Sequence, residues 1–216
     1  VAVGNQYVAP YITRAYNIGM ETLGKLFGST LRVKAMRYFL LNGDGAHLVV
    51  EVATRLKLKP PVISKELRAL ADVGFLKKKS VRGKTAFVLN TAFQHLIPIE
   101  TIILHPDFLR KDQLVKSLKK AGKIKMIVAA GVFMKNSESR LDLFMVGDRM
   151  KRPTVERIVR DFQTEIGKEI SYALFDTDEF VYRMNMRDKL VSDVLDFPHE
   201  QILVTPECST YLIAGR

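Results

Sequence analysis

Two short stretches of helical apolar periodicity, separated by adjacent prolines, constrain the fold of this chain more than any other feature. Apolar residues recur at roughly helical spacing in 49–56 and again in 61–73. The second stretch places three of them at positions i, i+4 and i+7: Ile63, Leu67 and Leu70. Pro60 disfavours helix in the residue before it, while Pro61 is tolerated in the first turn of a helix. The sequence therefore predicts two helices joined by a tight turn.

A two-stranded hairpin with a basic tip is expected directly after the second helix. Gly74 suits the position that follows a helix end, and strands are predicted at 75–76 and 85–89. The connection between the strands carries five cations: Lys77, Lys78, Lys79, Arg82 and Lys84. The face of the second helix opposite its apolar residues carries three polar side chains: Ser64, Lys65 and Arg68.

Positive charge is concentrated in this same region. The chain of 216 residues has a formal net charge of +11, and 47% of its residues are hydrophobic, enough to form a core. Residues 54–84 hold ten basic and two acidic side chains, whereas residues 121–216 hold 14 basic and 15 acidic ones. A focused cationic surface is what neutralisation of DNA phosphates requires. A solvated lysine-rich surface would give the same cluster, but the helix-turn-helix pattern favours nucleic-acid binding.

Residues 29–90 resemble the winged helix-turn-helix domain of small prokaryotic transcriptional regulators of the metal- and stress-sensing repressor type. The resemblance rests on 31–33 at the start of the preceding helix, 64–70 in the reading helix and 74–76 at the entry to the wing. It implies that the second helix enters the major groove of double-stranded DNA and that the wing touches the backbone or minor groove. The DNA-binding residues that it implies are Lys59, Ser64, Lys65, Arg68, Lys77, Lys78, Lys79, Arg82 and Lys84.

The segments on either side of this region are predicted to be helical. Ser29 is a good N-cap for a helix that ends near Leu41, before the glycines of 42–45. Residues 91–120 are expected to be mainly helical, and 93–104 is too apolar for an exposed helix. We interpret this apolar segment as core or as an interface between two subunits. A homodimer would place two reading helices about one DNA turn apart.

From residue 123 onward, strand-like and helix-like segments alternate, which predicts an α/β domain. Strands are predicted at 124–133, 141–146 and 169–175, and helices at 153–166 and 177–195. Thr177 is the expected N-cap of the last helix. The tail from residue 201 is a candidate for a further strand.

Residues 114–200 resemble minimal nucleotidyltransferase domains of the polymerase-β type. Those domains have a Gly-Ser turn that holds the triphosphate, and two Asp side chains on one face of the next strand that bind Mg²⁺ together. Here Gly131 matches the glycine, but Val132 stands at the serine position. Arg140 stands at the first metal-ligand position, so only Asp142 remains of the pair. An arginine cannot bind a cation and would repel one.

The resemblance therefore implies a nucleotidyltransferase-like fold without enzyme activity: no catalytic residue, no metal site and no cofactor. A vestigial nucleotide site is expected at Gly131, Ser139 and Asp142. The preferred role of Asp142 is that of a structural carboxylate, which pairs with Arg140 or caps a loop. The four histidines show no spacing typical of metal ligands, and Cys208 is expected to be a small buried residue.

Together these patterns predict an α+β protein, with an N-terminal winged helix-turn-helix domain and a C-terminal α/β nucleotidyltransferase-like domain on a small mixed sheet. The expected boundaries are an arm at 1–28, the winged domain at 29–105, a linker helix at 106–122 and the second domain at 123–216. No apolar run reaches the ~18 residues that cross a bilayer, and no signal peptide is recognised. We therefore expect a cytoplasmic protein without membrane contact, and a single cysteine fits that reducing compartment.

The leading hypothesis is a DNA-binding transcriptional regulator whose second domain serves sensing or assembly. An alternative is an active nucleotidyltransferase that acts on a protein or nucleic-acid partner, and this requires a carboxylate that the motif does not supply. A third hypothesis is a sensor whose second domain binds a nucleotide or small-molecule effector without turnover. In that case Gly131 and residues 134–139 would line the pocket.

Overall fold

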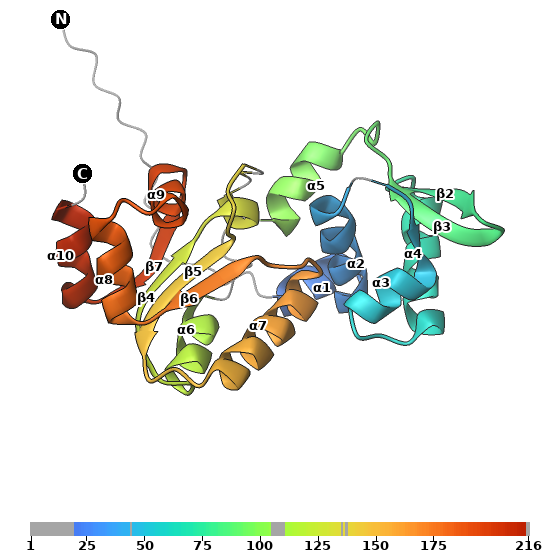
Figure 1. Ribbon diagram of the computed structural model, residues 1–216. Coiled ribbons are helices and arrows are strands. Elements are labelled where there is room, and N and C mark those ends of the chain that lie inside the picture. Colours follow the sequence, from blue (N-terminus) through green and yellow to red (C-terminus); the bar gives the residue numbers. More distant parts are fainter. Residues whose placement is uncertain (1–19, 44, 105–110, 135, 137, 215–216) are drawn as a thin grey trace, which may run out of the picture.

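The computed structural model describes residues 20–43, 45–104, 111–134, 136 and 138–214, and it is a mixed α+β protein, as predicted. Figure 1 shows one part with a small three-stranded sheet and a second part with a four-stranded sheet, both covered by helices. Residues 1–19 of the predicted arm lie outside the described residues, and α1 (Met20–Leu26) occupies most of the remainder. Residues 106–110 of the predicted linker helix also lie outside them, and α6 (Lys111–Lys119) accounts for most of the rest.

The first part has the predicted order of helix, helix, turn, helix and hairpin. Its elements after α1 are α2 (Thr30–Leu41), β1 (His47–Leu48), α3 (Val49–Arg55), α4 (Pro60–Asp72), β2 (Leu76–Val81), β3 (Lys84–Leu89) and α5 (Leu96–Ile103). Ser29 caps α2, as predicted, because its side chain accepts a hydrogen bond from the backbone N–H of Arg32 at 3.2 Å. Gly74 follows the end of α4 with a φ of +83°, the left-handed conformation that glycine adopts without strain.

The core of the first part draws one or more side chains from each helix and from the hairpin. Val33, Val52, Ile63 and Phe87 are all fully buried in it. The apolar segment 93–104 contributes as well, with Phe93, Leu96 and Ile99 packed against the buried cluster. Three apolar residues of the predicted buried stretches are instead exposed: Val50 of α3 (61%), and Ile97 (76%) and Ile102 (42%) of α5.

The second part is built on a mixed sheet of strand order β6-β5-β4-β7, in which β5 and β6 are parallel and the other pairs are antiparallel. After α6, its elements are β4 (Lys123–Ala129), the 3-10 helix η2 (Gly131–Met134), β5 (Leu143–Asp148), α7 (Arg152–Ile166), β6 (Tyr172–Phe175), α8 (Thr177–Asn185), α9 (Lys189–Asp196), β7 (Glu200–Val204) and α10 (Pro206–Ala214). The mixed sheet was predicted from the sequence, and β7 is the further strand expected in the tail.

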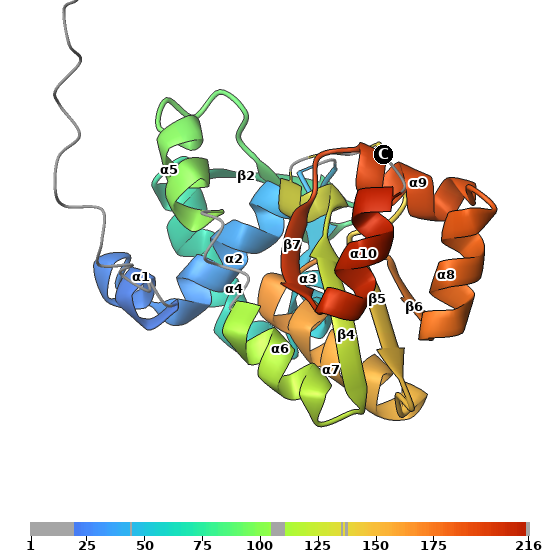
Figure 2. The same cartoon turned by 90° about the vertical axis from the view of Figure 1, so that its left-hand side faces the viewer.

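Helices cover both faces of this sheet. Figure 2 shows α6 and α7 against one face and α8, α9 and α10 on the other. Ile127 points to the first face and packs with the apolar residues of α6 and α7, while its neighbour Val128 points to the second. Cys208 is buried on that second face, as predicted. No helix in the described part of the chain has both the length and the apolar character that a membrane crossing needs.

Several predicted boundaries in the second part are wrong, among them the strand predicted at 169–175, which starts only at Tyr172. The strand predicted at 124–133 ends at Ala129, because Gly131 turns the chain with a φ of +52°. Asp176, not Thr177, caps α8 by accepting a hydrogen bond from Glu179 N at 2.8 Å. The helix predicted at 177–195 is two helices, since Asp188 starts α9 by accepting hydrogen bonds from the first N–H groups of that helix.

The two parts are joined directly at the end of α7. Asn42, which follows α2, donates from Nδ2 to the backbone oxygens of Tyr38 (2.8 Å) and Gly167 (3.0 Å). Lys168 Nζ donates to Leu41 O at 2.8 Å and so satisfies a carbonyl at the C-terminus of α2. Gly167 has a φ of +84°, and a Cβ there would lie 3.2 Å from Leu56. The first part therefore packs against a turn that accepts no larger residue without strain.

A set of ion pairs centred on the buried Lys125 ties α10 to the sheet. Lys125 on β4 forms ion pairs with Asp148 at 2.8 Å and Glu207 at 2.6 Å, and its side chain is only 9% exposed. Asp148 also accepts hydrogen bonds from the backbone N–H and the hydroxyl of Thr177. The bonds from Lys125 and Thr177 lower the pKa of Asp148 to about 2.

The stability that Asp148 contributes should therefore depend on pH. Because its pKa is lower in the folded protein than the ~3.9 of an unfolded chain, this contribution is present above that pH and is lost as the pH falls towards about 2. We expect Asp148→Asn to lower the free energy of unfolding in urea at neutral pH, and the difference from the wild type to shrink between about pH 4 and pH 2. Asp196→Asn, at an exposed carboxylate of α9, serves as the control. A difference that stays constant down to about pH 2 would contradict the assignment.

Candidate nucleic-acid interface

The helix α4 has one buried and one exposed face. Ile63 and Leu67 are fully buried, and Leu70 is 3% exposed, so the apolar face faces the core. Lys65 and Arg68 lie exposed on the opposite side, with Ser64 half-buried beside them. A surface hollow of about 500 Å³ runs along this outer face; it is lined by Pro61, Ser64, Lys65, Arg68, Ala69 and Asp72. The predicted reading residues therefore share one accessible surface.

The acidic residue in the middle of α4 is turned away from that surface. Glu66 accepts hydrogen bonds from the Ser29 hydroxyl at 2.8 Å and from Arg32 Nε at 3.0 Å, both near the N-terminus of α2. Arg32 also donates from Nη1 to Phe27 O at 3.0 Å. These contacts neutralise Glu66 and fix the orientation of α4 on α2. The outer face consequently keeps its positive charge.

The hairpin lies beside this face and carries exposed cations along its length. Arg82 and Gly83 form its two-residue turn with positive φ values of +49° and +74°, typical of a type I′ turn. Lys78 forms an ion pair with Asp72 of α4 at 3.5 Å, which links the hairpin to the end of the helix. The other hairpin cations named from the sequence are also exposed: Lys77, Lys79, Arg82 and Lys84.

The turn between α3 and α4 divides its cations between two environments. Lys59 is exposed at the N-cap of α4, as the predicted role requires. Arg55 and Lys57, by contrast, form ion pairs with Glu169 (3.2 Å) and Asp161 (3.1 Å) of the second part. The nine predicted DNA-binding residues thus all reach the surface, while two neighbouring cations help to hold the helix-turn-helix against α7.

At the predicted vestigial nucleotide site, the carboxylate of Asp142 binds backbone N–H groups. Asp142 accepts hydrogen bonds from the backbone N–H of Val132 at 2.7 Å and of Ser171 at 2.9 Å. A Cβ at Gly131 would collide with this carboxylate, which explains the glycine. Ser139 donates from its hydroxyl to Leu141 O at 2.7 Å. The three residues therefore form a closed turn in which Asp142 caps a loop, the second of its two expected structural roles.

The other expected role of Asp142, pairing with Arg140, is wrong. Arg140 Nε lies 3.1 Å from Asp193 of α9. Within the described residues, no group of three or more His, Cys, Asp or Glu side chains is placed to hold a metal ion.

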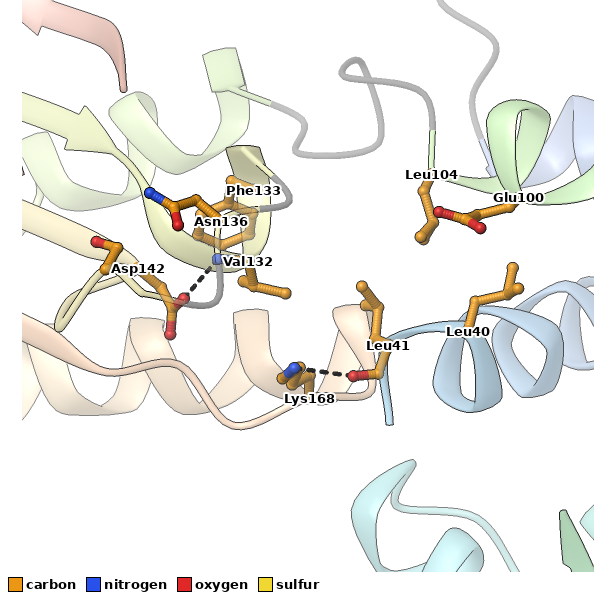
Figure 3. A pocket seen from close by; sticks show the side chains of 10 residues that line it. Leu40, Leu41, Glu100, Leu104, Val132, Phe133, Asn136, Asp142 and Lys168 are labelled. Atoms are coloured by element: carbon orange, nitrogen blue, oxygen red, sulfur yellow. Dashed lines mark hydrogen bonds between the residues drawn. The ribbon is translucent and has the colours of Figure 1, made fainter. Parts of the chain in front are cut away.

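A cavity of about 380 Å³ lies next to this turn, between the two parts of the chain. Figure 3 shows two leucines of α2 and Leu104, the C-cap of α5, on one side and the η2 turn with Asp142 on the other. Its lining consists of Leu40, Leu41, Glu100, Leu104, Val132, Phe133, Asn136, Ser139, Asp142 and Lys168. Of the residues that the sequence placed at a pocket, Gly131 and 134–139, the described Asn136 and Ser139 line this cavity. The sequence did not point to the leucines or to Lys168, because no local pattern indicates which distant segments meet.

Comparison with known proteins adds little to this geometry. No protein-family model matches the chain, and no curated protein matches it. Among solved structures, the chain has a similarity to IclR of Thermotoga maritima, with 22% sequence identity and a TM-score of 0.25. The match covers 52% of this chain and 41% of that chain. A TM-score this low does not establish a common fold.

Removal of the Asp142 carboxylate should destabilise the protein. Asp142→Ala leaves the N–H groups of Val132 and Ser171 without their acceptor, and we expect the free energy of unfolding to fall by about 2 kcal/mol. Asp161→Ala removes an exposed ion pair with Lys57 and should cost less than about 1 kcal/mol. Urea unfolding of the three proteins measures both values. Equal small losses would contradict the capping role of Asp142.

Proposed function

We propose that this protein is a DNA-binding transcriptional regulator. Its helix α4 would read the bases of duplex DNA, and its β2–β3 hairpin would bind the phosphate backbone. The observation that carries the proposal is the division of α4 into a buried apolar face and an exposed face with Lys65 and Arg68. A helix of this kind, on a helix-turn-helix and beside a basic hairpin, has the shape and charge that a major groove accepts. We also propose that the protein acts in the cytoplasm of a prokaryotic cell.

The proposed contacts fall into two classes. Lys59 and the hairpin cations would bind phosphates and fix the position of the protein on the duplex. Ser64, Lys65 and Arg68 would contact base edges, with the arginine suited to guanine. We further propose a homodimer, in which two copies of α4 read half-sites about one turn apart. The exposed Ile97 and Ile102 of α5 support a subunit contact on that helix.

Substitution of a base-reading residue and of a phosphate-binding residue should reduce DNA affinity in different ways. Arg68→Ala should weaken binding to a preferred duplex by about tenfold while changing binding to random duplex much less, because a base contact is lost. Lys79→Ala should weaken binding to both duplexes by similar factors, because a phosphate contact carries no sequence information. Fluorescence anisotropy with labelled duplexes measures the two ratios. If Arg68→Ala reduces binding to both duplexes equally, its role in base reading is refuted.

We propose that the second part is a degenerate nucleotidyltransferase-like domain that serves sensing or assembly. Two features support a loss of catalysis. Both carboxylate oxygens of Asp142 accept hydrogen bonds from backbone N–H groups. Arg140, which stands at the first metal-ligand position of the motif, carries a cation and is paired with Asp193. The cavity beside Asp142 supports the sensing role, because a small-molecule or nucleotide effector bound there would contact both parts of the chain.

The alternative, an active nucleotidyltransferase, makes a direct prediction of its own. Incubation of the protein with labelled ATP, Mg²⁺ and a protein or nucleic-acid acceptor should give no transfer of label if our proposal holds. A known nucleotidyltransferase with its own acceptor controls for the assay. Transfer that is measurable with the wild type and lost in Asp142→Asn would establish the alternative. A melting temperature that ATP shifts without transfer would instead support the sensing role.

A further inference from the structure

Two turns of the second part lie against each other at one end of the sheet. The turn between α6 and β4 meets the turn between β5 and α7, and Lys151 N donates to Ala121 O at 2.8 Å. Gly122 makes this contact possible, since a Cβ there would lie 2.6 Å from Arg149 O. In Figures 1 and 2 the end of α6 and the start of α7 lie side by side beneath the sheet. The fold therefore brings together two segments that are 30 residues apart in sequence.

These two turns carry a dense group of positive charges. Six exposed cations belong to it, here called the sheet-end cations: Lys119, Lys120, Lys123, Arg149, Lys151 and Arg152. None of the six makes an ion pair within the described part of the chain. The nearby carboxylates of Asp148 and Glu207 are both bound to Lys125. The hydrogen bond from Lys125 lowers the pKa of the Glu207 carboxyl, and the charge of Lys123, one of the six cations, adds to this effect.

Local stability accounts for only part of this group. Lys119 and Lys120 at the end of α6 interact favourably with the helix dipole. Lys151 and Arg152 lie at the start of α7, where cations interact unfavourably with the dipole and where the first turn has no acidic residue. The stability of α7 therefore does not explain the positions of these two cations.

The sheet-end cations lie at the far end of α7 from the helix-turn-helix. The C-terminal end of α7 contacts the first part through Gly167, as described above. The helix has 15 residues, so about 22 Å separates the sheet-end cations from this junction, and α4 lies beyond the junction (Figure 1). That span corresponds to about six to seven base pairs at 3.4 Å each.

We propose that the sheet-end cations bind the phosphate backbone of the same duplex, beyond the stretch that α4 contacts. The inference rests on the proposed DNA-binding function and extends it to the second part of the chain. Exposed, unpaired Lys and Arg side chains of this kind release counterions when they bind DNA phosphates, and this release favours binding. A membrane surface fits less well, because peripheral binding requires apolar side chains as well. No large hydrophobic residue is strongly exposed on α6 or α7 or in the described turns between them.

The test compares the full-length wild type with two variants that lose the same charge. The first is Lys119→Gln/Arg149→Gln/Arg152→Gln, and the control is Lys25→Gln/Arg187→Gln/Lys189→Gln, at exposed cations elsewhere on the surface. DNA binding is measured by fluorescence anisotropy over a range of salt concentrations. Two random-sequence probes are used: a duplex of about 30 base pairs, and a duplex of about 8 base pairs that is closed at one end by a hairpin loop.

The inference predicts that the first variant binds the long duplex at least about tenfold more weakly, with a salt slope smaller by about 2 to 3. Its affinity for the short duplex should change much less, and the control variant should match the wild type on both. If the first variant keeps the wild-type affinity and salt slope on the long duplex, the inference is overturned while the proposed function stands. If the wild type binds neither duplex, the proposed function itself fails. The inference would also be overturned if these cations were needed for binding to phosphatidylserine vesicles but not for binding to DNA.

Discussion

Burial of one face of α4 is the constraint on which the rest of this account depends. Three apolar residues at helical spacing can enter the core only if the residues between them point outward. Complete burial of two such side chains stabilises the fold by roughly 1.5–3 kcal/mol each, so the orientation of the helix is not free to reverse. The hydrogen bonds that Glu66 accepts from Ser29 and Arg32 also hold α4 in this orientation. Lys65 and Arg68 are therefore presented by the same interactions that make the first part fold.

In the second part, the turn at Gly131 is filled by a side chain of the chain itself. Backbone N–H groups near a glycine turn are well placed to bind an anion, and here Asp142 is that anion. A carboxylate that is bound in this way stabilises the turn and is not free to bind a metal ion. The cavity that remains between the two parts is bounded by leucines, an aromatic ring and a few polar groups, a composition common among ligand sites. Its position next to Asn42 and Lys168 means that an occupant would contact the junction between the parts.

The sequence predicted well those features that depend on neighbouring residues. The spacing of Ile63, Leu67 and Leu70, the N-cap at Ser29 and the glycine after α4 each reflect local geometry, and the structure has all three. Boundaries were missed where two residues compete for one role. Asp176 replaced Thr177 as a cap because its carboxylate accepts from the N–H of Glu179, and Asp188 began a new helix inside an apolar pattern.

Features formed by distant segments were not predictable in this way. Nothing near Arg140 in sequence indicated Asp193 as its partner, and nothing near Leu41 indicated Lys168. The near-neutral charge of residues 121–216 concealed four of the six sheet-end cations, because the net charge of a segment does not show where the fold places each charge. The role of each predicted DNA-binding residue remains a prediction, although all nine reach the surface that the role requires.

The most direct measurement of the central claim is selection of binding sites from a pool of random duplex DNA, read by sequencing. If α4 reads base edges, the wild type should enrich a short motif, and a dimer should enrich two copies of it related by twofold symmetry. Recovery of a pool that binds tightly but shares no motif would contradict base reading by α4. Failure to retain any duplex at low salt would contradict DNA binding altogether.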